Sequence, residues 1–344
     1  MASENLNAPT PPVGVIESLT QGFETVAGHL PLLLLPVLLD LFLWAGPRIS
    51  FQPAAEAMAN AYIATWEPFA ESSPSDLQEM WEQQTEILLE VVENMPAQYL
   101  PIPGIPSLLS GREAKGLPFD YTPPLWLVET AAGFIGIKLL LLLIGLILGS
   151  LYIILIAQQV RENRPEVRDL IRRLPVLTFQ IGLFALLTPL LLIALLLPFL
   201  LISGMLAFLN GFLATATQWV GAMFILWVGV FTVFTLHGLL LNDRSLLGAL
   251  WDSVRVVQWN MPATIFLFLL VLVLDTALTR YVWSLPEADS WLVLPGIAGR
   301  AFIATGLITA TFVFYKDRYR YWKEMREELL AELLRRRAQQ NRNQ

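Results

Sequence analysis

The chain has 344 residues, of which 55% are hydrophobic and 15% are charged, and its formal net charge is −7. Soluble domains usually contain about 45 to 50% apolar residues, so this composition excludes an ordinary soluble protein and indicates that lipid surrounds most of the chain. The absence of cysteine excludes disulfides, thiolate metal sites and a cysteine nucleophile.

The chain begins with a polar, proline-rich segment, residues 1–12, which is typical of a disordered tail. Between residues 13 and 26 the apolar side chains recur every three or four positions, and this spacing predicts an amphipathic helix on the membrane surface. The same pattern predicts surface helices at 167–174 and 246–257.

Six apolar stretches are long enough to cross a membrane, since a transmembrane helix needs about 20 mainly apolar residues. They cover residues 26–45, 131–157, 177–208, 212–241, 261–284 and 291–315. We therefore predict an all-α fold, a polytopic helical bundle in which residues 13–315 form a single six-span membrane domain. A surface helix ahead of each pair of spans suggests three repeats of one unit; independent recurrence of common membrane features is the alternative.

A long acidic loop, residues 46–125, separates the first two spans and carries eleven acidic residues against Arg48, Arg112 and Lys115. Within it, residues 75–94 have a helical apolar stripe with Ser75 as the expected N-cap. Seven prolines between 96 and 124 predict an extended cover over the bundle. We expect this loop subdomain to pack on the spans; a docking surface for another protein is the alternative.

Basic residues lie mostly on alternate connections and in the tail. Sixteen of the 22 lysines and arginines fall after the second and fourth spans or in residues 316–344. Because positively charged loops stay in the cytoplasm, we expect both termini to be cytoplasmic and the acidic loop to be outside. Residues 316–344 continue the last span as an amphipathic helical tail, whose basic start suits anionic lipid headgroups.

Small residues within the spans predict close helix packing. They are Gly145 and Gly149 in the segment GLILG, and Gly296, Gly299 and Gly306 in the last span.

Several ionisable residues lie within or beside the predicted spans, where charge is costly and therefore suggests a function. Three of the apolar stretches are too short to cross the membrane unless they include a charged residue, namely Asp40, Asp275 or Arg300. Arg280 is expected nearer the outer face than these three. Glu129 and Lys138 lie at the edge of the second span. Opposite charges at one depth are expected to pair, and we predict an Asp275–Arg300 pair. A structural ion network, a pathway for a polar substrate or protons, and catalysis are the three roles that these charges suggest.

No catalytic motif accompanies them. The sequence contains no HExxH, GxSxG, GxGxxG or P-loop pattern, and Asp40 and Asp275 lack the glycine-flanked context of intramembrane aspartyl proteases. His29 and His237 lie toward the other face of the membrane, so we expect no shared metal site. We assign no catalytic residue, cofactor or metal ligand.

The segment SLLGALWDSVRVVQWNMPATIFLFLLVL, with Ser253, Val256, Val257 and Asn260 ahead of a span, resembles the repeated unit of bacterial six-helix proteins related to the glycerophosphoryl diester phosphodiesterase membrane domain. The opening stretch, with Gly22 and Phe23 ahead of LLLLPVLLDLFLW, resembles bacterial membrane proteins of unknown function. The resemblance implies a bacterial plasma-membrane location and a shared fold. It does not extend to hydrolysis, because this chain has no appended phosphodiesterase domain.

These observations predict a multi-pass membrane protein, most simply a non-enzymatic one, that handles a lipid or a small polar solute as a transporter does. One alternative is a structural or scaffolding subunit of a membrane complex, which would use the acidic loop or the C-terminal tail; a remote alternative is an intramembrane enzyme. The expected partners are membrane lipids, including anionic headgroups at the cytoplasmic face, and a protein at the outer loop or the tail. No nucleic-acid partner is expected.

Overall fold

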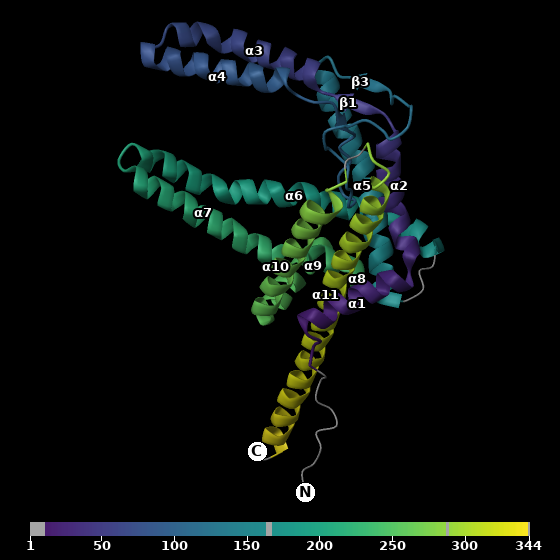
Figure 1. The fold of residues 1–344 in the computed structure, drawn as a ribbon. Helices are drawn as coiled ribbons and strands as arrows, with labels where there is room; N and C mark the ends of the chain where they lie inside the picture. Colours follow the sequence, from purple (N-terminus) through teal and green to yellow (C-terminus); the bar gives the residue numbers. More distant parts are fainter. Residues whose placement is uncertain (1–10, 163–166, 287–288, 343–344) are drawn as a thin grey trace. The chain divides into compact units, whose positions relative to one another are not determined.

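The computed structural model describes residues 11–162, 167–286 and 289–342 and shows an all-α helical bundle (Figure 1). Within these residues five helices are long and apolar enough to cross a membrane, or six if α1 (Val15–Gly28) and α2 (Leu34–Ala45), joined through a short 3₁₀ turn, form one broken span. The chain is therefore a multi-pass membrane protein. Of the predicted tail 1–12, residues 1–10 lie outside the described residues.

Two compact units divide the chain. The first comprises residues 1–30, 153–275 and 305–344, and the second comprises residues 31–152 and 276–304. Three long helices contribute to both units: α5 (Ala131–Glu162), α10 (Met261–Leu278) and α11 (Val293–Arg342).

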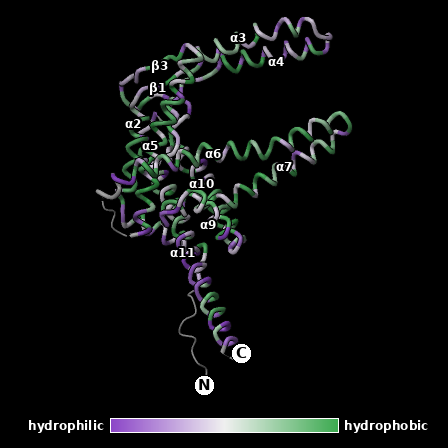
Figure 2. Tube along the Cα trace, turned by 180° about the vertical axis from the view of Figure 1, so that it is seen from behind, coloured by the Kyte–Doolittle hydropathy of each residue, from purple (hydrophilic) through white to green (hydrophobic). Residues whose placement is uncertain are grey.

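The first unit contains a long apolar hairpin, formed by α6 (Val167–Ala207) and α7 (Gly211–Thr232), which lie side by side in Figures 1 and 2. Asn210 caps α7, because its side-chain oxygen accepts hydrogen bonds from the backbone N–H groups of Phe212 (2.9 Å) and Leu213 (3.4 Å). The buried Ser203 hydroxyl donates to the Ala214 carbonyl at 3.0 Å and joins the two helices. Most large apolar side chains of α6 are exposed, as expected for a helix that contacts lipid.

After α7 the chain breaks and continues as α8 (Thr235–Leu241) and α9 (Leu246–Trp259). The buried Ser253 hydroxyl on α9 stabilises this break, since it accepts from the Phe234 N–H (3.0 Å) and donates to the Phe231 carbonyl (2.7 Å). Ser253, Val256 and Val257 are all buried. These residues therefore have a packing role.

Helix α1 packs closely on the part of α11 that lies in the first unit. A Cβ added at Gly22 would lie 2.6 Å from the backbone nitrogen of Ala310, and one at Gly306 would overlap the Phe23 ring. The hydrogen bond from the Val13 N–H to Asp317 Oδ2 (2.7 Å) holds the start of this segment against α11. The predicted role of Gly306 in close packing is thus confirmed, and Gly22 has the same role.

The second unit contains α2, the acidic segment 46–125 and the first part of α5. The acidic segment contains two antiparallel helices, α3 (Gln52–Glu71) and α4 (Ser75–Glu93), which appear as a hairpin in Figure 1. Helix α4 matches the predicted one, although Pro74 rather than Ser75 occupies the N-cap position. Helix α3 was not predicted, because Pro53 and Pro68 and a weak apolar stripe mask its helical pattern.

A small sheet, also not predicted, is formed by one strand before the hairpin and two strands after it. It has the order β2–β1–β3, in which β1 (Arg48–Ser50) pairs antiparallel with β2 (Gln98–Tyr99) and parallel with β3 (Leu125–Leu127). Between β2 and β3 the described chain has no helix, which confirms the extended segment that the prolines predicted.

Other predicted features take a different form. The surface helix expected at 167–174 is the beginning of the continuous helix α6, so it is not a separate element. Gly145 and Gly149 admit a loop rather than a neighbouring helix, since a Cβ at Gly149 would lie 2.7 Å from the Gly104 carbonyl oxygen. Gly104 itself has a φ of +89°, which only glycine adopts readily. Gly296 and Gly299 likewise adjoin Trp283, which lies in the π-helical turn Thr279–Trp283.

Candidate functional site

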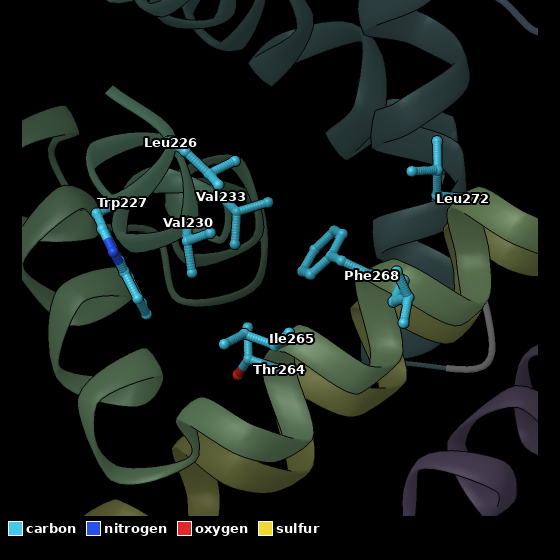
Figure 3. A pocket seen from close by; sticks show the side chains of 10 residues that line it. Leu226, Trp227, Val230, Val233, Thr264, Ile265, Phe268 and Leu272 are labelled. Carbon is cyan, nitrogen blue, oxygen red and sulfur yellow. The ribbon is translucent and has the colours of Figure 1, made fainter. Parts of the chain in front are cut away.

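An apolar groove in the first unit runs between α7 and α10. It has a volume of about 500 Å³, and both helices contribute large apolar side chains to it. Figure 3 shows that the side chains from α7 face those from α10 across the opening. The lining residues are Leu226, Trp227, Gly229, Val230, Val233, Thr264, Ile265, Phe268, Leu269 and Leu272. No charged residue is among them.

Helical spacing explains the two walls. Leu226 and Val230 are four residues apart on α7, and Val233, the C-cap residue that follows the helix, is three residues further on, so the three lie on one face. The same spacing places Ile265, Phe268 and Leu272 on one face of α10. Gly229 has no atom within 4 Å of an added Cβ, so its missing side chain contributes to the open space. Sequence reasoning missed this groove, because α7 and α10 are apolar on every face and their periodicity gives no preferred side.

A second apolar cavity, of about 440 Å³, lies in the same unit among α6, α7, α8 and α9. Thr188, Thr232 and Thr235 provide its polar side chains, and the remaining lining residues are apolar. The first unit therefore offers two sites whose chemistry suits hydrocarbon.

Asp40, the first of the predicted embedded charges, is fully buried in the second unit. Its carboxylate accepts hydrogen bonds from the Ser107 hydroxyl and from the backbone N–H groups of Leu108 (2.8 Å) and Leu109 (3.2 Å). Asp40 therefore attaches α2 to the proline-rich segment, which is a structural contribution.

Arg300 lies close enough to Asp40 for their charges to attract each other, and Arg112 experiences the charges of both. The pKa of Arg112 is lower than its ordinary value. Partial burial is the larger cause, and repulsion from Arg300 is the smaller one. Arg112 donates to the Ser284 hydroxyl at 3.0 Å. Sequence reasoning counted Arg112 only as a loop charge, because its neighbours are distant in the chain.

The remaining predicted charges are placed as follows. Asp275 is partly exposed near the end of α10, and Arg280 is exposed in the π-helical turn. Asp275 belongs to the first unit and Arg300 to the second, so their pairing stays a prediction. Glu129 is exposed ahead of α5, and the Lys138 ammonium lies 4.5 Å from the centre of the Phe51 ring, a cation–π contact.

The two histidines have local partners in the first unit. The Nδ1 of His29 donates to the Thr25 carbonyl (3.0 Å), and its Nε2 is 2.7 Å from the amide nitrogen of Gln159, which donates to it. His237 is buried, and its Nε2 is hydrogen-bonded to the Thr311 hydroxyl at 2.8 Å. Among the described residues, no three acidic or histidine side chains are grouped to hold a metal ion.

An ion cluster in the first unit was also missed by sequence reasoning. Asp243, with a positive φ of 49°, binds Arg161 of α5 at 3.0 Å and Arg173 of α6 at 2.8 Å. Nearby in sequence, Arg244 binds the buried Asp252 (3.1 Å) and the Tyr319 hydroxyl (3.0 Å). These contacts join the turn between α8 and α9 to α5 and α6 through Asp243, and to α9 and α11 through Arg244.

The geometry thus comprises apolar cavities, a structurally anchored carboxylate and ion clusters, without an arranged nucleophile and base among the described residues. Comparison with known protein families, curated proteins and solved structures finds no match for this chain.

Proposed function

We propose that this protein is a non-enzymatic, multi-pass membrane protein that handles lipid, and that it holds an acyl chain in the groove between α7 and α10. The groove supports this proposal, because its volume of about 500 Å³ lies within the usual range for ligand pockets, roughly 300 to 1,000 Å³. Its wall of leucine, isoleucine, valine, phenylalanine and tryptophan suits a hydrocarbon chain and offers no ion pair to a polar solute.

The cellular setting is part of the same proposal. The distribution of basic residues favours cytoplasmic termini, and the resemblance of residues 245–272 to bacterial six-helix membrane proteins favours a bacterial plasma membrane. Because the residues that carry this resemblance pack the break between α7 and α8, it supports a shared fold more than a shared activity.

A photoactivatable phospholipid tests the proposal. Wild-type protein in lipid nanodiscs should be labelled on residues 226–233 and 264–272 at least about fivefold more than on the exposed face of α6, which reports ordinary lipid contact. Gly229→Leu should remove this preference by filling the groove, because the new side chain enters open space. Gly204→Leu on α6, which is equally unobstructed, is the matched control and should leave it unchanged.

Equal labelling of the groove and of α6 in wild-type protein would contradict lipid handling. The polar-solute alternative predicts a different outcome in reconstituted vesicles, namely that Asp275→Asn abolishes solute flux while the protein remains folded. Flux that survives this substitution would count against it.

The second candidate function is that of a scaffolding subunit, and the hairpin of α3 and α4 favours it. Residues 52–94 contain nine acidic residues and no basic one. The hairpin also exposes large apolar side chains, among them Tyr62, Trp66, Phe69, Met80 and Ile87. A protein partner with a basic, apolar surface would complement it. Deletion of residues 56–90 should then release the partner from a purified complex and leave the groove labelling intact.

A further inference from the structure

A cavity of about 290 Å³ in the second unit combines positive charge with buried hydrogen-bond donors. Segments from three parts of that unit line it: β2, the loop that follows it, and the chain between the π-helical turn and α11. The lining residues are Tyr99, Leu108, Leu109, Arg112, Glu113, Lys115, Ser284, Leu285, Pro286 and Val293.

The small sheet assembles this site. In its register Arg48 of β1 lies opposite Tyr99 of β2, and the Arg48 guanidinium lies 4.7 Å from the centre of the Tyr99 ring. The Tyr99 N–H donates to the Arg112 carbonyl at 3.0 Å, and Arg48 Nη1 donates to the Lys115 carbonyl at 2.6 Å. Arg112 and Lys115 thereby line the cavity, and Arg48 lies behind Tyr99.

The side chains of Arg48 and Tyr99 are buried, and each has polar atoms without a hydrogen-bond partner among the described residues. Arg48 is 7% exposed, and its Nε and Nη2 atoms have no hydrogen-bond partner among the described residues. Tyr99, which lines the cavity, is 1% exposed, and its hydroxyl also has no hydrogen-bond partner among the described residues. Buried polar groups are nearly always hydrogen-bonded, because leaving one unpaired costs about 1 to 3 kcal/mol. The Tyr99 hydroxyl, which belongs to a lining residue, therefore points to a ligand that accepts a hydrogen bond.

The charges around the cavity favour an anion. Arg112 and Arg300 repel each other, and the carboxylate that attracts both, Asp40, already accepts three hydrogen bonds from the loop. Glu113 is the acidic residue in the lining, against the basic residues Arg112 and Lys115, and all three are exposed. A small anion next to Arg112 would reduce the repulsion between the two guanidinium groups.

We propose that this cavity binds a compact oxyanion, a phosphate or carboxylate group, through the Arg112 guanidinium and the Tyr99 hydroxyl, with Arg48 supplying positive charge behind Tyr99. The planar guanidinium group matches two oxygens of such an anion. The anion is either a free solute or the headgroup of an anionic lipid, and both present the same chemistry to these residues. The site does not depend on the groove in the first unit.

Calorimetric titration of the full chain tests this site. Protein in phosphatidylcholine nanodiscs is titrated with inorganic phosphate and, separately, with sodium acetate; a parallel sample in phosphatidylglycerol nanodiscs reports the lipid source. Binding of phosphate or acetate in the neutral discs indicates a free anion. A higher melting temperature in phosphatidylglycerol discs, lost in Arg112→Gln, indicates a headgroup.

Arg112→Gln should weaken binding at least about tenfold, and Arg112→Lys should have an intermediate effect because it keeps the charge and loses the planar group. Tyr99→Phe, which preserves packing, should weaken binding several-fold. Arg335→Gln, a substitution on the exposed C-terminal helix, is the control and should leave binding unchanged. Absence of binding in every arm, or equal binding by wild type and Arg112→Gln, would overturn the proposal.

Discussion

Asp40 illustrates how a charged residue in a predicted span can serve structure. The apolar stretch around Asp40 is too short to cross the membrane without including this residue, so the sequence predicts that Asp40 lies within the span. The side chain is indeed fully buried. Its hydrogen-bond partners lie 67 to 69 residues away in the chain. No local pattern could have identified them, because they depend on how the proline-rich segment returns to α2.

We predict that Asp40→Ala lowers the free energy of unfolding by about 3 kcal/mol, since it removes hydrogen bonds to a charged group and leaves buried N–H groups unpaired. Chemical denaturation in detergent micelles measures the change. Ser107→Ala, which removes one donor, should have a smaller effect. In the double variant, Ser107→Ala should add almost nothing to Asp40→Ala, because the two residues share one network. Fully additive effects would show that the network contributes little.

At the scale of elements, close approach of helices depends on individual glycines. Gly22 and Gly306 allow α1 to lie against α11 within the first unit. Glycine weakens a helix by about 1 kcal/mol relative to alanine, so a glycine in mid-helix indicates a requirement for space. The sequence marks such positions, but it does not say whether a helix, a loop or a side chain fills the space, as Gly149 and Gly104 demonstrate.

We predict different effects for two alanine substitutions in α1. At Gly22 the added methyl group would lie 2.6 Å from the Ala310 backbone, so Gly22→Ala should lower the melting temperature, by the equivalent of about 1 to 3 kcal/mol. At Gly28 nothing lies within 4 Å, so Gly28→Ala should be neutral or slightly stabilising. Thermal unfolding in detergent compares the two. Equal melting temperatures would mean that α1 does not pack on α11 as described.

At the scale of the whole molecule, the exposed apolar surface of the helices reflects the lipid that surrounds them. Helices α6 and α7 expose leucine, phenylalanine and tryptophan along their length, and only hydrocarbon accommodates such a surface without aggregation. The end of α11 is much more hydrophilic, and the hydropathy colours of Figure 2 show this change along the single helix. The predicted last span and the predicted tail are therefore one continuous element.

The predicted orientation is testable by cysteine labelling, since the chain contains no native cysteine. In intact bacterial cells, Ser72→Cys, in the turn between α3 and α4, should react with a membrane-impermeant maleimide. Gln340→Cys, near the end of α11, should react only after the cells are permeabilised. Both positions are exposed, so accessibility to the reagent depends on membrane sidedness. The reverse pattern would invert the topology.

Sequence alone was sufficient for the properties that depend on composition and local spacing. These are the lipid environment, the all-α class and the approximate bounds of the apolar helices. Each follows from the transfer free energy of side chains between water and hydrocarbon, which is summed along a continuous stretch.

Only the tertiary structure decided which residues meet. It placed Tyr99 and Arg112 around one cavity, with Arg48 behind Tyr99, left a groove between α7 and α10, and attached Asp40 to a distant loop. Such contacts depend on the packing and backbone pairing of segments far apart in the chain. An apolar helix that could bury any of its faces does not encode that choice in its own periodicity.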